Sequence, residues 1–307
     1  MKIGITGATG FIGARIIELA QQKGHTLVGF TRNTSRPVPG CIETRKFSYD
    51  EKVNVDGCEA IIHLAGEPVF GLWTKEKRRR ISESRILGTR RIMEAIAACP
   101  APPHTLISGS AVGYYGDTGE NEVDEDSPPG TGFLADVVQS WEHEALQQPL
   151  SSARANQPLP TLANPLRVVT LRTSIVLGRH GALQTMVPIF RAGLGGPLGS
   201  GRQWMSWIHI DDEASLALFA LENTHITGPL NAAAHHPCRN TDFTKSLACA
   251  VHRPAFFRAP AFLLKTVLGD FSHELLDSKR VLPRRALAAG FKYRFPSLDA
   301  ALADLLS

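Results

Sequence analysis

The first 24 residues constrain the fold of this chain more than any other stretch. A short apolar run at residues 2–6 ends at a turn with Gly7, Gly10 and Gly13, and an amphipathic run follows as far as residue 24. This order predicts a strand, a glycine turn and a helix. Gly7 permits the tight turn, Gly10 lets backbone N–H groups approach a pyrophosphate, and Gly13 lets the helix lie close to the strand. Because the helix N-terminus would then face the anion, the pattern predicts dinucleotide binding.

The length and composition are those of a globular α/β protein. With 307 residues, of which 43% are hydrophobic, the chain is long enough for a full core and a smaller second lobe. We expect no signal peptide and no membrane anchor, because no apolar run reaches the length of a bilayer span. Five scattered cysteines without a C-x-x-C pair indicate neither a disulfide framework nor a metal site, and they favour a cytoplasmic protein.

The charge balance favours a small anionic ligand. The net charge is +4 and the pI is about 8.9, but the basic residues are dispersed except at position 75 and positions 77–80. No aromatic residues are interleaved with a basic stripe, so we expect no nucleic-acid partner and no membrane partner.

The end of the second predicted strand, at residues 25–31, indicates which dinucleotide fits. An acidic residue there would accept a hydrogen bond from a free ribose 2′-hydroxyl and repel a 2′-phosphate. This chain has Thr31 followed by Arg32. Because a guanidinium pairs with phosphate, the sequence favours NADP(H) over NAD; the alternative is a solvated arginine at the start of a loop.

Two later stretches extend the predicted cofactor site. A buried strand at residues 58–64 ends at Leu64 and opens into Ala65 and Gly66. These small residues allow the backbone to approach the phosphates and ribose of the cofactor. The long helix expected at residues 73–99 carries a basic run, which is typical of a solvated face. Arg80 and Arg85 are the exceptions, because they lie near a predicted phosphate-binding end and are candidates for a second cation.

Hydroxyl groups follow the next predicted strand, at residues 105–109. Ser110, Tyr114 and Tyr115 come directly after it, where parallel α/β proteins usually place their chemistry. These three are the candidate catalytic residues. The alternative is a turn whose tyrosines pack beneath a covering loop.

With a further strand at residues 42–47, the pattern predicts a doubly wound parallel sheet of six strands, the last at residues 167–177. We expect a dinucleotide-binding domain at residues 1–177, with a surface linker at 149–165, and a substrate lobe at residues 178–307 that is partly interleaved with the first domain. In the lobe we expect a strand at 204–210 and helices at 212–222, 240–252, 283–289 and up to residue 306. Asn240 or Thr241 would cap the second of these helices, and Ser297 the last.

Several runs resemble a known family. Thr-Gly-Ala-Thr-Gly-Phe-Ile-Gly at 6–13 and Ile-His-Leu-Ala at 62–65 are similar to the extended short-chain dehydrogenase/reductase superfamily. Leu-Ala-Gly-Glu-Pro at 64–68, Ser-Arg at 84–85, Gly-Ser-Ala-Val-Gly-Tyr-Tyr-Gly at 109–116, the glycine-rich run 193–203, Trp-Ile-His-Ile-Asp-Asp at 207–212 and Arg-Pro-Ala at 253–255 resemble its atypical branch, the epimerase family of NAD-dependent epimerase/dehydratase-like proteins. The resemblance implies NADP(H) as the ligand. It implicates Thr9, Gly10, Phe11, Ile12, Thr31, Arg32, Leu64, Ala65, Arg80, Arg85 and Val176 in binding it.

Two departures from the superfamily bear on activity. Phe133 and Val137 stand where a Tyr-x-x-x-Lys pair would open a helix, and neither side chain carries a proton. Ser110 does match the superfamily's catalytic serine, so Tyr114 or Tyr115 would replace the missing phenol.

Trp204 and a methionine follow the Gly-x-Gly-x-Gln run at 199–203, where nucleotide-sugar enzymes carry an arginine. With Trp207 nearby, this weakens a nucleotide-sugar reading and favours a flatter, more apolar substrate.

The sequence therefore leaves two functions open. The first is an NADP(H)-binding oxidoreductase or epimerase-like enzyme that acts on an unidentified carbonyl or hydroxyl compound with an atypical proton donor. The second is a non-catalytic NADP(H)-binding redox sensor or regulatory protein, which the missing Tyr-x-x-x-Lys pair favours. The superfamily often dimerises through helices packed on the sheet, so a homodimer through residues 73–99 and 133–147 is possible.

Overall fold

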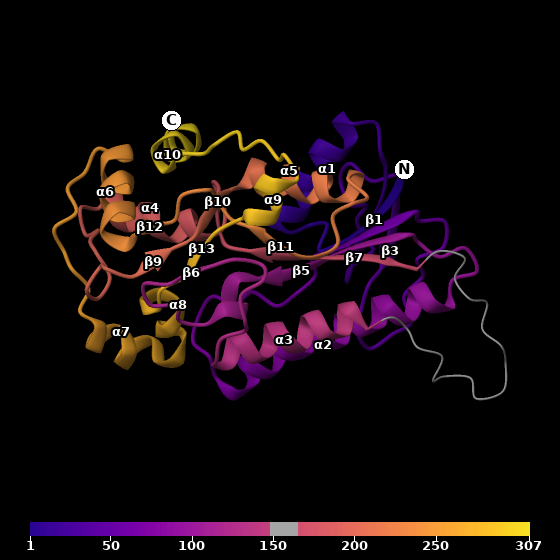
Figure 1. Ribbon diagram of the computed structural model, residues 1–307, viewed down its shortest axis with the longest axis horizontal. Coiled ribbons are helices and arrows are strands. Elements are labelled where there is room, and N and C mark those ends of the chain that lie inside the picture. The colour runs from indigo at the N-terminus through magenta and orange to yellow at the C-terminus, as the bar shows by residue number, and fades with distance from the viewer. Residues whose placement is uncertain (148–164) are drawn as a thin grey trace.

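A seven-stranded parallel sheet forms the centre of the computed structural model, which describes residues 1–147 and 165–307 (Figure 1). The strand order is β11-β7-β5-β4-β1-β2-β3, and every neighbouring pair is parallel. The strands are β1 (Lys2–Thr6), β2 (Thr26–Thr31), β3 (Glu43–Lys46), β4 (Ala60–His63), β5 (Thr105–Ala111), β7 (Arg167–Thr173) and β11 (Gly228–Ala232). The chain starts at the middle of the sheet and winds first to one edge and then to the other, so the predicted doubly wound fold is confirmed.

Helices cover both faces of the sheet. In Figure 1, α1 (Phe11–Gln22), α5 (Ile210–Glu222) and α9 (Arg284–Ala288) lie above it, whereas α2 (Lys75–Ala98) and α3 (Phe133–Leu146) lie below. Successive strand residues point to opposite faces. Ile107 therefore packs in the core with α1 and α5, while Leu106 packs in the core with α2 and α3. The near-continuous apolar strands are those of a sheet that is buried on both sides.

The seventh strand, β11, was not among the six predicted. Its residues, Gly228-Pro229-Leu230-Asn231-Ala232, include three types that are depleted in strands. Proline is tolerated because β11 is the edge strand beyond β7, where an absent N–H breaks no ladder bond on the open side. A segment C-terminal to residue 177 thus completes the central sheet.

Two predicted strands are each divided in the structure. The expected strand at 167–177 ends at Thr173, because Ser174 directs its N–H and Oγ to the carbonyl of Ala232. The chain then leaves the main sheet as β8 (Ile175–Leu177), which pairs with β10 (Trp207–His209). The expected strand at 204–210 is likewise interrupted, at Ser206, between β9 (Trp204–Met205) and β10.

The C-terminal lobe packs around a second core. Its further elements are α4 (Ala182–Arg191), β12 (Cys238–Arg239), α6 (Asn240–Ala250), α7 (Ala261–Leu268), η2 (Gly269–Phe271), α8 (Ser272–Leu276), β13 (Arg280–Val281) and α10 (Leu298–Leu306); β13 pairs with β6 (Glu122–Val123). The predicted cap of α6 is wrong: Arg239 is the N-cap, and the Asn240 side chain accepts instead from the Leu198 N–H. Ser297 does cap α10.

The predicted linker at 149–165 lies outside the described residues, apart from residue 165. Among the helices of the described chain, none combines the length and apolar character needed to cross a bilayer.

Candidate active site

The turn between β1 and α1 has the geometry predicted for a dinucleotide cradle. Gly7 has a φ of +68°, and its carbonyl accepts a hydrogen bond of 2.8 Å from the Gly10 N–H. A Cβ on Gly13 would lie 2.3 Å from the Gly7 oxygen, so only glycine permits this close approach of helix to strand. No side chain caps α1, and Thr9 and Gly10 are exposed. The backbone N–H groups of this helix N-terminus are therefore free of a competing side chain and suit an anion.

Phe11 and Ile12 join this turn to the C-terminal lobe. A Cβ on Gly178 would lie 2.2 Å from the Phe11 ring, so the ring is seated against the loop that follows β8. Ile12 and Val176 both pack, partly buried, against the cores of the two halves. The resemblance placed Val176 beside the cofactor, and the structure puts it on β8, two residues before Gly178, against which the Phe11 ring is packed.

The loop after β4 lies directly beside the glycine turn. Thr6 Oγ1 accepts hydrogen bonds from the N–H groups of Leu64 and Ala65, at 3.1 and 3.2 Å. A Cβ on Gly7 would approach the Leu64 carbonyl to 3.0 Å. The structure therefore brings the two predicted cofactor loops together at the carboxyl edge of the sheet.

Cations gather around one carboxylate beside this edge. Lys77 Nζ lies 2.8 Å from Glu67 Oε1, and Arg80 Nε lies 4.0 Å from the same oxygen. Hydrogen bonding from Lys77, with smaller contributions from Arg80 and from Arg32 at the end of β2, holds the pKa of Glu67 below its ordinary value. Thr31, just before Arg32, accepts a hydrogen bond from the Asn33 N–H. Three cations against one carboxylate leave this corner positive, which suits a phosphate.

The Arg85 guanidinium makes contacts within the protein and is not available to a phosphate. Its Nη1 donates to the carbonyls of Glu67 and Ile81, at 2.9 and 3.2 Å, and its guanidinium lies over the Trp141 ring. Burial lowers its pKa to about 10. Because a Cβ on Gly66 would contact the guanidinium at 3.4 Å, Arg85 supports the loop at Gly66 from below.

A buried ion pair lies beneath the candidate catalytic residues. Arg172, on β7, and Glu142, on α3, are joined by two hydrogen bonds of 2.8 Å, and their side chains are 3% and 6% exposed. Ser110, directly across from Arg172 in the sheet register, donates its hydroxyl proton to Glu142 Oε1 at 2.6 Å. Ser110 is itself only 4% exposed. Because the Ser110 hydroxyl donates its proton to the carboxylate, Ser110 can act toward a ligand only as a hydrogen-bond acceptor.

Tyr115 belongs to the same buried network. Its hydroxyl donates to Asn231 Oδ1 at 2.8 Å and accepts from Arg172 Nη1 at 2.9 Å. The residue is 3% exposed, and burial raises its pKa to about 12. Tyr115 therefore ties η1 (Val112–Tyr115) to β7 and β11, and its proton is not available to a ligand.

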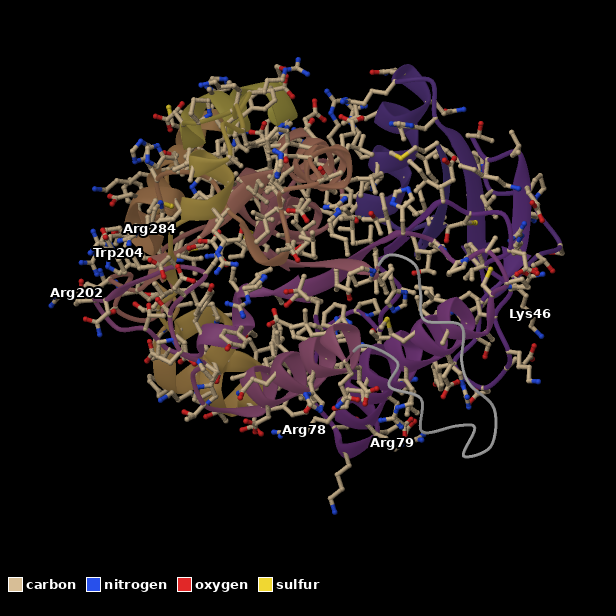
Figure 2. All side chains as sticks on the ribbon, turned by 45° about the vertical axis from the view of Figure 1, so that its right-hand side comes forward. Lys46, Arg78, Arg79, Arg202, Trp204 and Arg284 are labelled. Carbon is tan, nitrogen blue, oxygen red and sulfur yellow. The ribbon has the colours of Figure 1, made fainter. Side chains whose placement is uncertain are left out.

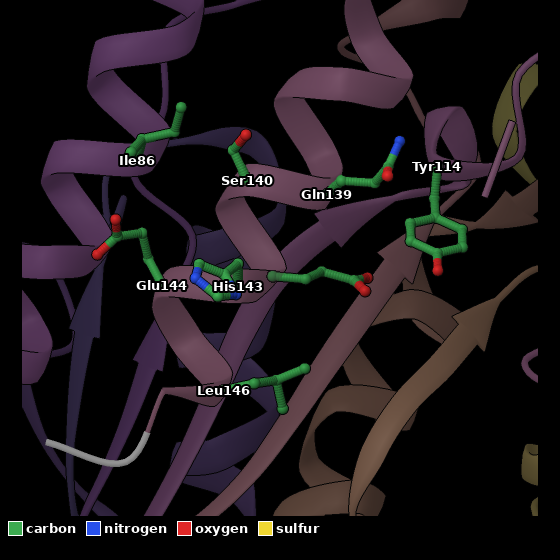
Figure 3. A pocket seen from close by; sticks show the side chains of 8 residues that line it. Ile86, Tyr114, Gln139, Ser140, His143, Glu144 and Leu146 are labelled. Carbon is green, nitrogen blue, oxygen red and sulfur yellow. The ribbon is translucent and has the colours of Figure 1, made fainter. Parts of the chain in front are cut away.

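Tyr114 differs from the other two candidates because it is only partly buried. Its ring centroid lies 3.5 Å from the Arg172 guanidinium carbon, a cation–π contact. Its side chain also lines an open pocket of about 680 Å³ along α3, together with Glu142, Gln139 and His143 (Figure 3). None of the predicted cofactor residues lines that pocket, and the glycine turn lies instead at the carboxyl ends of the strands.

The positions of the missing Tyr-x-x-x-Lys pair are filled by apolar packing. The Phe133 ring lies 5.1 Å from that of Trp73 and 4.9 Å from the guanidinium carbon of Arg78. Trp73 in turn contacts Phe271, which precedes α8. Val137 is buried in α3. The start of α3 therefore packs in a cluster of aromatic rings where the superfamily has a proton relay.

The tryptophans from which a flat substrate was predicted do not face a cleft. Trp207 is 1% exposed in the core, and Trp204 is held between the guanidinium groups of Arg239 and Arg280, at 4.2 and 4.3 Å. Figure 2 places Trp204 and Arg202 at the outer edge of the molecule. His209 is buried and caps α5. These residues give no support to the substrate inference drawn from them.

Sequence reasoning missed Glu142, Arg172 and Asn231. Arg172 and Asn231 each directly follow a leucine in a strand, which is a signal, since a buried polar group needs a partner, whereas Glu142 stands beside His143 and Glu144 and carries no such signal. Their pairing brings together residues that are 30 to 116 positions apart and was not readable from spacing.

Comparison with known proteins gives the same picture as the geometry. Residues 3–232 match the family model described as NAD dependent epimerase/dehydratase family, and residues 259–305 match a domain of unknown function, DUF1731. The epimerase family protein SDR39U1 of Mus musculus is 36% identical over 313 residues, covering 100% of both chains. The epimerase family protein YfhF of Bacillus subtilis is 32% identical over 316 residues, covering 100% of this chain and 98% of its own.

Solved structures agree over the full length. The human epimerase family protein SDR39U1 (isoform 2), crystallised with NADPH, superposes with a TM-score of 0.86 at 34% identity, covering 100% of this chain and 99% of that one. A nucleoside-diphosphate sugar epimerase of Corynebacterium glutamicum gives a TM-score of 0.77 at 30% identity, covering 100% of this chain and 58% of that one. The protein therefore belongs to the NAD dependent epimerase/dehydratase family.

Proposed function

We propose that this protein is an NADP(H)-dependent oxidoreductase or epimerase-like enzyme that acts on a small molecule with a carbonyl or hydroxyl group. The observation that carries the proposal is Tyr114, a partly accessible phenol seated on the Arg172 guanidinium where β5 ends. The glycine cradle lies at the same edge of the sheet. The human relative crystallised with NADPH supports this choice of cofactor.

The residues at the edge of the sheet fit NADP(H). The close approach of Gly13 to Gly7 leaves the start of α1 uncapped, so its free N–H groups would hold the pyrophosphate of a bound dinucleotide. Arg32, Arg80 and Lys77 supply the positive charge that a 2′-phosphate requires. When bound, the nicotinamide supplies or accepts a hydride.

The chain's own residues would handle the proton. Tyr114 donates its phenolic proton to a substrate carbonyl in the reductive direction, and the guanidinium of Arg172 under its ring stabilises the phenolate that results. Ser110, whose proton is held by Glu142, accepts a hydrogen bond from a substrate hydroxyl and so orients it. Tyr115 holds Arg172 in place.

Two observations favour the non-catalytic alternative. Ser110 is almost fully enclosed, and Phe133 occupies the position of the usual acid. In that case the protein binds NADP(H) and reports redox state without transferring a hydride.

A single experiment separates the two functions. The purified protein is titrated with NADPH and with NADH, and NADPH fluorescence is then followed while a panel of aldehydes, ketones and quinones is added. We expect NADPH to bind more tightly, Arg32→Asp to reverse this preference, and one chemical class to oxidise the cofactor. Tyr114→Phe should retain NADPH binding and lose turnover by about 10²-fold or more. Tight binding without oxidation by any compound would refute the enzyme and favour the sensor.

The cytoplasmic location and a homodimer through α2 and α3 remain predictions from the sequence.

A further inference from the structure

The outer edge of the C-terminal lobe is unusual in its charge. Residues 179–210 and 243–269 contain no aspartate and no glutamate, although seven arginines and lysines fall within them. The two segments lie side by side, because the Ala259 N–H donates to the Pro197 carbonyl at 3.0 Å and the Gly199 N–H donates to the Ala259 carbonyl at 2.8 Å. They form one continuous surface, at whose borders the described chain has two carboxylates, Asp242 and Asp270, which pair with Lys245 and Arg78.

Large apolar side chains protrude from this same edge. Phe256, Phe262, Leu194, Phe257 and Val267 are 83%, 72%, 60%, 60% and 59% exposed, and we call these five residues the apolar edge. Two lie on α7, an apolar helix none of whose residues is buried. Figure 1 shows α7 at the lower left corner of the molecule, away from the sheet. Large apolar side chains on a protein surface are usually scattered singly, so a group of them in one place indicates an interaction surface.

The basic residues that lie beside the apolar edge indicate the charge of its partner. Arg258 and Lys265 stand among its apolar residues, and neither takes part in an ion pair with any described residue. Arg253 directs its Nε to the Arg191 carbonyl, which leaves its charge uncompensated. A second copy packed on this surface by two-fold symmetry would bring these like charges together. An anionic partner would instead pair its negative charges with these cations.

Contrary to the expectation from the sequence that the protein has no membrane partner, we propose that the apolar edge docks on the surface of an anionic lipid bilayer. Its aromatic and aliphatic side chains protrude individually and are placed to enter the headgroup region, while Arg253, Arg258 and Lys265 remain at the level of the anionic headgroups. The attachment is peripheral, and it is independent of cofactor binding, because the glycine cradle lies at the sheet edge within the N-terminal half.

Vesicle binding tests the proposal. The full-length protein is sedimented with phosphatidylcholine vesicles that contain or lack phosphatidylserine, at low and high salt. We expect binding only to the anionic vesicles, with loss at high salt. Arg258→Glu/Lys265→Glu should weaken partitioning by about 30-fold or more, since each cation near such a surface contributes about fivefold. Lys46→Glu/Lys52→Glu is the matched control, because Lys46 lies at the opposite side of the molecule in Figure 2 and the change in net charge is the same.

The apolar contribution has its own control. Phe256→Ser/Phe262→Ser should abolish binding that survives at moderate salt, whereas Ile42→Ser, at a side chain 71% exposed in the N-terminal half, should not change it. NADPH affinity and melting temperature verify that each variant is folded. Absence of binding to anionic vesicles at low salt would overturn the proposal. So would equal binding by the variants and their controls, or binding to a soluble polyanion as tight as to vesicles, which would indicate an acidic macromolecule.

Discussion

Removing the charge of Glu142 is the strictest test of the buried network beneath Tyr114. The Glu142 carboxylate accepts three hydrogen bonds, two of 2.8 Å from Arg172 and one of 2.6 Å from Ser110, and both members of the ion pair are at most 6% exposed. Glu142→Gln preserves the shape and one acceptor but leaves the guanidinium without a counter-charge. Breaking a buried pair at one partner costs about 3–5 kcal/mol, so we expect a loss of about 3 kcal/mol in unfolding free energy.

Urea denaturation measures this loss. The slope rises with chain length and reaches about 3 kcal/mol per molar urea or more for a protein of this size, so a loss of 3 kcal/mol lowers the midpoint by up to about 1 M at unchanged slope. Glu144→Gln is the matched control on the same helix, because its partner Arg90 is 49% exposed and a surface pair contributes about 0–1 kcal/mol. Glu142→Met/Arg172→Met should recover most of the loss, since it removes both buried charges.

Equal shifts for Glu142→Gln and Glu144→Gln would refute the reasoning. The Glu142–Arg172 pair would then contribute no more than a surface pair, and the proposed support of Ser110 and Tyr114 by a fixed buried charge would fail with it.

Three further predictions follow from single residues. Gly13→Ala should abolish NADPH binding in a titration, because its Cβ would lie 2.3 Å from the Gly7 oxygen, whereas Gly88→Ala in α2, whose Cβ would meet no atom closer than 3.6 Å, should retain binding. Burial lowers the pKa of His63 to about 3, so stability should fall as the pH drops from about 6.5 toward 3, where only the unfolded chain is protonated; His63→Asn should flatten that limb of the urea midpoint against pH. Burial raises the pKa of Glu213 to about 8, so its folded form keeps a proton and stability should fall as the pH rises from about 4.5 toward 8. Glu213→Gln should remove this slope, and an unchanged slope in either variant would contradict the assignment.

The parts of the fold that local chemistry dictates were predictable from the sequence. The turn at Gly7 and Gly13 follows from sterics, because no other residue fits the positive φ or the 2.3 Å approach. The helix at 75–98 follows from its apolar periodicity and from Thr74, which caps it. By contrast, β11 forms although it contains Gly228, Pro229 and Asn231, because pairing with β7 outweighs its poor strand propensity.

The candidate site was only partly predictable, for a different physical reason. The residues predicted to contact the cofactor lie on loops whose glycines and strand ends are visible in order along the chain. The partners of Ser110 and Tyr115 come from α3, β7 and β11, and only the three-dimensional register brings them together. Sequence alone could not distinguish Tyr114 from Tyr115, because the difference lies in which phenol reaches Asn231.

The missing lysine and the buried arginine are best understood as one arrangement. In the superfamily pattern the cation beside the catalytic phenol comes from a helix, but Val137 of α3 carries no charge, and α3 instead directs Glu142 into the sheet. The cation beside Tyr114 is Arg172, which comes from β7 and is held by that carboxylate. A lysine at 172 could not make both hydrogen bonds to Glu142 and still stack flat under the ring, since it lacks the planar fork of donors. Position 172 therefore requires an arginine, and the Glu142 carboxylate offsets the free-energy cost of burying its charge.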